Sequence, residues 1–172
     1  MKTNIATPTW GMPIPTPEGE FVARYSRTGL CGLEFPSGSK GRKRDSDSVR
    51  PPAQVRRWHA IASAALRLAL VGQPPKRLPP LDLFAGTEFQ RRVWRALRKI
   101  GWGRTWSYGQ VAEAIRKPRA SRAVGCACGA NPIPVFVPCH RVLAANNGLG
   151  GFSAGLKWKR ALLECEGIRL AW

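Results

Sequence analysis

Two helix-start signals dominate the second half of the chain. Thr87 is followed by Gln90, and Ser107 by Gln110. A hydroxyl residue with a glutamine three positions later forms a capping box, which satisfies free amide groups at the start of a helix. After the first box, apolar residues recur every three or four positions, as expected for one face of a helix: Phe89, Val93, Leu97 and Ile100. The second half is therefore predicted to be mainly helical.

A further helix is expected from Ala120 or Ser121 to Cys128, after the short helix of the second box ends at Lys117-Pro118. Helix, tight turn and helix together predict a helix-turn-helix. The last of these helices consists almost entirely of small residues. A helix with its side chains is about 10–12 Å across and the minor groove of B-DNA about 6 Å wide. Such a helix could enter a widened minor groove or pack closely on a neighbouring helix, and its composition leaves both open.

The first half has a different pattern. Phe21–Tyr25 and Leu30–Phe35 are strand-prone runs that predict a hairpin. Gln54–Val71 has helical periodicity, and Leu78–Phe84 predicts a short strand bounded by prolines. We expect an α/β protein, with a small α/β N-terminal domain over residues 1–85 and a mainly helical C-terminal domain with a helix-turn-helix over residues 86–172.

Two segments are expected to be poorly ordered. Residues 1–15 are rich in proline and threonine. Residues 37–52 contain many serine, glycine and charged residues, including the basic cluster Lys40–Arg44. A nuclear-import or DNA-contact role for this cluster is an alternative, but a solvated mobile loop is the favoured interpretation.

The formal net charge is +18, from 28 basic and 10 acidic residues. A polyanionic partner would use this charge, and nucleic acid is the first candidate. The alternative is a generally cationic surface that keeps the protein in solution. No apolar run is long enough to span a bilayer, and the first residues lack the pattern of a signal peptide. These features predict a cytoplasmic protein with no membrane partner.

The cysteines do not suggest a metal site or disulfides. There are five, an odd number, and none forms a Cys-x-x-Cys pair. Cys31 and His59 invite a zinc interpretation, but two ligands are too few. We therefore expect reduced thiols, no bound metal and no cofactor.

The Cys139-His140 pair is the strongest candidate for chemistry. It follows Pro138 and the apolar run Ile133–Val137, which predicts a strand. A thiolate is a strong nucleophile, and a neighbouring base can generate it. Adjacent residues of a strand point to opposite faces, so His140 can assist Cys139 only if Pro138 ends the strand and turns the backbone. The alternative for a bare Cys-His pair is a buried structural cysteine.

The context of this pair resembles a known signature. Pro138–Val142, preceded by Asn131-Pro132 and followed by the glycine-rich Asn147–Ser153, is similar to the active-site region of O6-alkylguanine-DNA alkyltransferases. The similarity extends over Gly86–Gly167. Weaker similarity to the first hairpin of that family lies upstream, at Thr16–Gly19 and Gly29–Leu33.

The resemblance implies catalytic roles. Cys139 would take the alkyl group by direct displacement, with His140 as a base acting through a bound water and Glu166 orienting and charging that histidine. Asn131 would be the hinge between the DNA-binding helix and the active site. Tyr108 would push the 3′ phosphate and help to protonate the leaving guanine. An S-alkyl cysteine does not regenerate the thiol, so each molecule would act once.

The resemblance also implies the partner and its contacts. The partner would be double-stranded DNA that contains O6-alkylguanine, with O4-alkylthymine as a second candidate substrate, bound by a monomer after base flipping. Arg122 would fill the gap in the base stack. Small neighbours would lie in the minor groove, namely Ser121, Ala123, Gly125 and Ala127. Val142, Phe152 and Ser153 would line the base pocket, although the family often has tyrosine in place of Phe152.

Three other functions are weighed against this one. Alkyltransferase-like proteins only flag lesions and lack the cysteine, whereas Cys139 is present here. A transcriptional regulator of this type would carry a four-cysteine zinc domain, which the N-terminal half does not contain. An ordinary thiol hydrolase would have no use for so large a positive charge.

Overall fold

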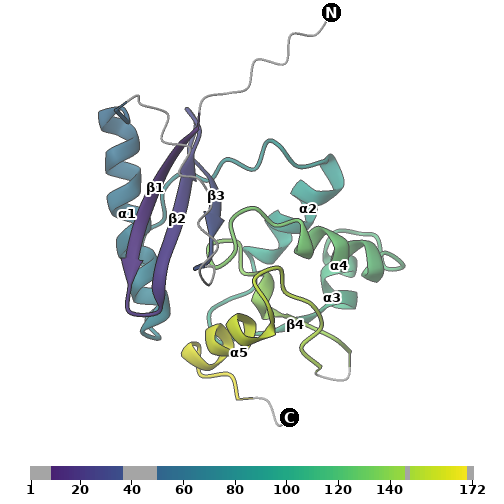
Figure 1. Cartoon of the computed structure of the whole chain (residues 1–172). Helices are drawn as coiled ribbons and strands as arrows, with labels where there is room; N and C mark the ends of the chain where they lie inside the picture. The colour runs from purple at the N-terminus through teal and green to yellow at the C-terminus, as the bar shows by residue number, and fades with distance from the viewer. Residues whose placement is uncertain (1–8, 37–49, 146–147, 170–172) are drawn as a thin grey trace, which may run out of the picture.

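The computed structural model describes residues 9–36, 50–145 and 148–169. A small antiparallel sheet with one long helix beside it forms the N-terminal part, and a group of shorter helices forms the rest (Figure 1). The basic cluster Lys40–Arg44 lies outside the described residues. No helix of the described part is long and apolar enough to cross a membrane.

The sheet has the strand order β1-β2-β3, with β1 at Trp10–Thr16, β2 at Gly19–Tyr25 and β3 at Leu30–Glu34. The predicted hairpin of β2 and β3 is confirmed. Strand β1 shows that the expectation of disorder was wrong for the later part of residues 1–15; residues 1–8 are not described. Proline is tolerated in β1 because this strand lies at an edge of the sheet, where a missing N–H need not leave a neighbour unpaired.

Helix α1 spans Ala53–Leu70, as its periodicity predicted, and buries Ala62, Ala65 and Leu66. The expected strand at Leu78–Phe84 is not formed. Within the described residues this segment makes an isolated bridge between Leu81 and Leu30. Pro79 and Pro80 carry no amide hydrogen and so cannot extend a ladder.

The predicted helices of the second half are present. They are α2 at Glu88–Leu97, α3 at Tyr108–Ala114 and α4 at Ser121–Gly129. Both predicted capping boxes are formed, with the Thr87 and Ser107 side chains each accepting a hydrogen bond from the backbone of the glutamine three residues on. Helices α3 and α4 pack on each other and on α2 (Figure 1), which confirms the helix-turn-helix arrangement.

The apolar run Ile133–Val137 forms a turn, so the expectation of a strand was wrong. The Val137 amide donates to the Ile133 carbonyl at 2.9 Å, and Val135 has a φ of 76°. Prolines at positions 132, 134 and 138 remove the donors that a strand would need. The chain then enters a 3₁₀ turn, η1 at Cys139–Arg141, followed by β5 at Val142–Leu143 and α5 at Leu156–Cys165.

Two short strands pair next to η1. Strand β4, at Trp106–Ser107, pairs in parallel with β5. This pairing places the start of α3 beside the chain that leaves η1.

The sheet and the helices share one buried apolar cluster. Phe35, just after β3, lies edge-to-face on Trp158 of α5 with ring centroids 4.9 Å apart. The Leu33 amide donates to the Pro132 carbonyl at 2.9 Å. The N-terminal part therefore supports the turn that carries the candidate site, and the domain boundary at residues 85/86 stays a prediction.

Candidate functional site

Cys139 is buried at the first position of η1, with 3% of its surface exposed. The Asn131 side-chain amide donates to its Sγ at 3.1 Å and to the Val137 carbonyl at 2.7 Å. The Asn131 Oδ1 accepts from the Ile133 amide at 3.1 Å. Asn131 therefore joins the end of α4, the following turn and the thiol.

The environment of Cys139 favours the neutral thiol. Burial raises its pKa to about 11, and the hydrogen bond from Asn131 and the positive charge of Lys159 only partly oppose this effect. A thiol with this pKa holds its proton at neutral pH. Nucleophilic chemistry at Cys139 therefore needs a base.

His140 has the geometry that such a base would need. Its Nε2 lies 2.8 Å from Oε1 of Glu166. Burial lowers the pKa of His140, although the Glu166 carboxylate opposes the shift. The ring is therefore neutral at pH 7, with its proton on the Nε2 that faces the carboxylate. Its Nδ1 is then a free acceptor. This nitrogen is buried and has no hydrogen-bond partner among the described residues.

Arg141 holds the other side of Glu166. Its Nε donates to Oε2 at 2.8 Å and its Nη2 to Oε1 at 2.9 Å. The Gly103 amide adds a hydrogen bond to Oε2 at 3.1 Å. Burial alone would raise the pKa of Glu166, but the hydrogen bonds from His140 and Arg141 outweigh it and keep the pKa below its ordinary value. The carboxylate is therefore ionised at neutral pH.

Lys159 of α5 is fully buried and ties three segments together. Its ammonium group donates to the Val142 carbonyl at 2.6 Å, to the Gly151 carbonyl at 3.3 Å and to the Leu149 carbonyl. Burial lowers its pKa to about 8. Lys159 thus fixes the glycine-rich loop against the strand that follows η1.

Sequence reasoning missed the roles of Arg141 and Lys159. Lys159 precedes Leu162 and Leu163 by three and four positions, so helical periodicity alone places it on the apolar face of α5. A charged residue on such a face was the available signal. For Arg141 the signal was an arginine directly inside an apolar block.

Tyr108, the first residue of α3, is half-buried, and burial raises its pKa. It lies against α4, where a Cβ built on Gly125 would be 3.7 Å from its ring. It also lies against the glycine-rich loop. A Cβ on Gly150, which has a φ of 63°, would come within 2.6 Å of the Tyr108 hydroxyl oxygen. This close approach explains the glycine at position 150.

Helix α4 has one buried side and one exposed side. Ala127 is 2% exposed, and its carbonyl accepts a hydrogen bond from Trp94 Nε1 of α2 at 2.8 Å. The Ala127 side chain therefore packs in the core, and its expected contact with DNA stays a prediction. Arg122 and Ala123 are exposed, and Ser121 and Gly125 are partly exposed. The close-packing interpretation thus applies to the buried side of the helix, and the minor-groove interpretation stays a prediction for the exposed side.

The expected base-pocket residues differ in exposure. Val142 is buried, Phe152 is partly buried and Ser153 is exposed. The Phe152 ring lies 5.8 Å from that of Phe35 in an edge-to-face arrangement.

The two residues considered for zinc make other contacts. Cys31 Sγ donates to the Arg24 carbonyl at 3.4 Å, and His59 Nδ1 lies 3.2 Å from the Tyr25 hydroxyl. Among the described residues there is no group of three histidine, cysteine or acidic side chains that could hold a metal ion.

Comparison with known proteins identifies the family. Residues 88–168 match the family model described as the 6-O-methylguanine DNA methyltransferase, DNA binding domain. A crystal structure of Mycobacterium tuberculosis OGT in complex with DNA is similar over 90% of both chains, with 37% sequence identity and a TM-score of 0.73. The chain belongs to the O6-methylguanine-DNA methyltransferase family.

Curated relatives match about half of this chain. The methylated-DNA–protein-cysteine methyltransferase of Mycobacterium bovis is 55% identical over 89 residues, which are 52% of this chain and 53% of the relative. The match thus spans about half the length of that relative. O6-methylguanine-DNA methyltransferase from Pyrococcus kodakaraensis shares the fold, with 23% identity and a TM-score of 0.61.

Proposed function

We propose that this protein repairs DNA by moving the alkyl group of O6-alkylguanine onto Cys139, once per molecule. The observation that carries the proposal is the free Nδ1 of His140, next in sequence to a buried thiol and joined through its other ring nitrogen to an ionised carboxylate. Membership of the family and the names of the relatives support the same chemistry.

In the proposed mechanism, a water molecule bridges Cys139 and the Nδ1 of His140. The thiol proton passes through this water to Nδ1, and the Glu166 carboxylate stabilises the imidazolium. The thiolate attacks the alkyl carbon, so that a carbon–sulfur bond forms and the bond from carbon to O6 breaks. The electron pair stays on guanine, which takes a proton from Tyr108. Asn131 holds the thiol and the turn in place throughout.

DNA binding is assigned to the exposed side of α4. Arg122, Ala123 and the partly exposed Ser121 and Gly125 would approach the minor groove of the duplex. Because Cys139 is almost fully buried, a stacked base cannot reach it, so the damaged nucleotide must be flipped out. Arg122 would then occupy the vacated place in the stack.

The flipped base would enter beside the glycine-rich loop that Lys159 holds. Val142 would contribute to the wall of the pocket, while Phe152 and Ser153 would close over the base. We propose that a monomer carries out the whole reaction, and O4-alkylthymine is a second candidate substrate for the same pocket.

The test is intact-mass measurement after incubation with duplex DNA that carries one O6-methylguanine. We expect one added methyl group per protein molecule, located on the peptide that contains Cys139, and a plateau when the protein is consumed. Cys139→Ser should bind the same duplex without gaining mass. Repeated turnover would contradict the single-use mechanism, and binding without transfer by the unmodified chain would indicate a lesion-flagging protein instead.

A further inference from the structure

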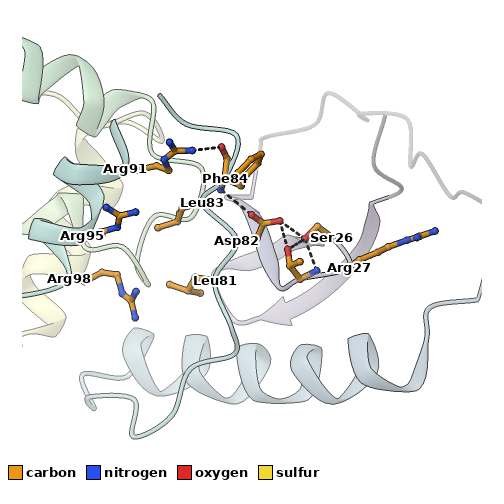
Figure 2. Close-up of a pocket in the computed structure, with 10 residues that line it drawn as sticks. Ser26, Arg27, Leu81, Asp82, Leu83, Phe84, Arg91, Arg95 and Arg98 are labelled. Atoms are coloured by element: carbon orange, nitrogen blue, oxygen red, sulfur yellow. Dashed lines mark hydrogen bonds between the residues drawn. The ribbon is translucent and has the colours of Figure 1, made fainter. Parts of the chain in front are cut away.

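A hollow lies away from Cys139, between α2, the turn that follows β2 and the segment 81–84. It has a volume of about 580 Å³. Figure 2 shows Arg91, Arg95 and Arg98 along α2 on one side, with Asp82 and the β2–β3 turn on the other. We call this hollow the α2 groove.

The arginines of the α2 groove form a row. Arg91, Arg95 and Arg98 are spaced by four and three residues, so they share one side of the helix. The row is about 10 Å long at 1.5 Å per residue. A row of this length can follow the backbone of a strand and contact more than one of its phosphates.

These charges are not neutralised within the described structure. Among the described residues, neither Arg95 nor Arg98 makes an ion pair or a hydrogen bond through its side chain. The carboxylate of Asp82 accepts hydrogen bonds from the side chains of Ser26 and Thr28 and from the Phe84 amide, and it is one negative charge against the four arginines that line the groove, Arg27, Arg91, Arg95 and Arg98. The α2 groove therefore presents free positive charge to solvent.

An exposed aromatic ring lies beside this row. Phe84 is 82% exposed, more than any other large apolar side chain in the described part of the chain. The Arg91 guanidinium lies 5.6 Å from its ring centroid, and Arg91 also donates to the Phe84 carbonyl at 3.2 Å. A basic row with an exposed aromatic platform is the combination by which proteins bind single-stranded nucleic acid, since phosphates pair with the cations and bases stack on the ring.

The α2 groove is separate from the exposed side of α4. Trp94 of α2 donates to Ala127 on the buried side of α4, so the two helices meet through their inner faces. Arg122 and Ala123 face solvent on the other side of α4. A duplex on α4 would therefore leave the α2 groove open. A second copy of this chain is a poor occupant, because 28 basic residues against 10 acidic ones bring like charges together.

We propose that the α2 groove is a second nucleic-acid site, which binds single-stranded DNA while α4 holds a duplex. Arg95 and Arg98 contact backbone phosphates, and Phe84 stacks on one base. The site has no part in the chemistry at Cys139, so it is independent of the proposed alkyl transfer.

The test measures fluorescence anisotropy of a labelled oligothymidylate added to the full chain, with the protein first saturated with a short unlabelled duplex. Arg95→Gln combined with Arg98→Gln should lower the salt slope of single-strand binding by about 1.4, because each phosphate that is no longer neutralised accounts for about 0.7. Phe84→Ala should weaken binding by about 5-fold to 100-fold. The charge-matched control is Arg56→Gln combined with Arg57→Gln, two exposed arginines of α1 outside the groove, and it should leave both values near those of the unmodified chain.

Three outcomes would overturn the proposal. Complete displacement of the oligothymidylate by the duplex would overturn the proposal, because it would show one shared site. So would equal weakening in the groove and control variants, which would show only general electrostatics. Loss of duplex binding with single-strand binding retained would assign the groove to the duplex backbone and overturn the single-strand assignment. Reaction of Cys139 with free O6-benzylguanine, measured on the same preparations, reports the proposed alkyl transfer separately and should be unchanged in all groove variants.

Discussion

His140 Nε2 donates to Glu166 Oε1 at 2.8 Å, and the opposite ring nitrogen of His140 is left without a hydrogen-bond partner among the described residues. In the proposed mechanism, this relationship sets the direction of proton transfer. The carboxylate holds the ring proton on one side, so the ring can accept a proton only on the other. It also accounts for the position of Glu166 at the end of α5, where its side chain turns inward between His140 and Arg141.

The pH dependence of alkyl transfer should reveal the role of His140. The pKa of Cys139 is raised to about 11, so without a base the thiolate population rises about tenfold per pH unit up to that value. His140→Ala should therefore react about 10²–10⁴-fold more slowly with free O6-benzylguanine near pH 7 and recover as the pH rises. The unmodified chain should show a shallower profile. His59→Gln, at the other histidine of the chain, is the control, and a shallow profile in His140→Ala would refute the base assignment.

Glu166 should stabilise the fold in a pH-dependent way. Its pKa in the folded state lies below its ordinary value of 4.5, so its stabilising effect is present above about that pH and is lost as the pH falls through the folded-state pKa. Glu166→Gln should lower the free energy of unfolding by about 3–5 kcal/mol at pH 7, since it leaves Arg141 buried and unpaired. Urea unfolding should show this difference shrinking in acid. Glu164→Gln, an exposed neighbour on the same helix, should change little; an equal loss there would contradict the explanation.

Lys159 should stabilise the folded state and hold the glycine-rich loop in place. Lys159→Met keeps much of the side-chain volume but removes the donor from the Val142, Leu149 and Gly151 carbonyls. An orphaned buried acceptor costs about 1–3 kcal/mol, so we expect a loss of that order and faster proteolysis in the glycine-rich loop. The control is Lys157→Met, at an exposed position two residues earlier. Equal protease resistance in the two variants would show that Lys159 does not hold the loop.

Arg122 should separate base flipping from chemistry. If its side chain fills the vacated stack, Arg122→Ala should slow repair of duplex DNA, because unstacking costs a few kcal/mol and its compensation is removed. The reaction with free O6-benzylguanine needs no flipping and should stay near the parental rate. Arg119→Ala, an exposed arginine in the turn before α4, is the matched control for charge. Similar losses on duplex and free base would remove the insertion role from Arg122.

Local patterns in the sequence determined the helices. The capping boxes at Thr87 and Ser107 and the periodic apolar residues of α1 and α2 act within one or two helical turns, so their effects can be predicted without the rest of the chain. The same holds for the hairpin of β2 and β3. Strand β1 was missed because its prolines are unfavourable in most strands, and only its position at the edge of the sheet makes them acceptable.

The candidate site was evident in the sequence, since Cys139, His140 and Glu166 were all named from it. The contacts that hold these residues in place were not evident. Arg141 and Lys159 are charged residues that the sequence alone would place on the surface, and each is buried only because carboxylate or carbonyl oxygens from distant segments surround it. Such oxygens converge through tertiary packing of α5 against η1 and β5, and no local pattern encodes that convergence. The sequence thus determined which helices form and which thiol could react, whereas the tertiary structure decided which charges could be buried and what they hold in place.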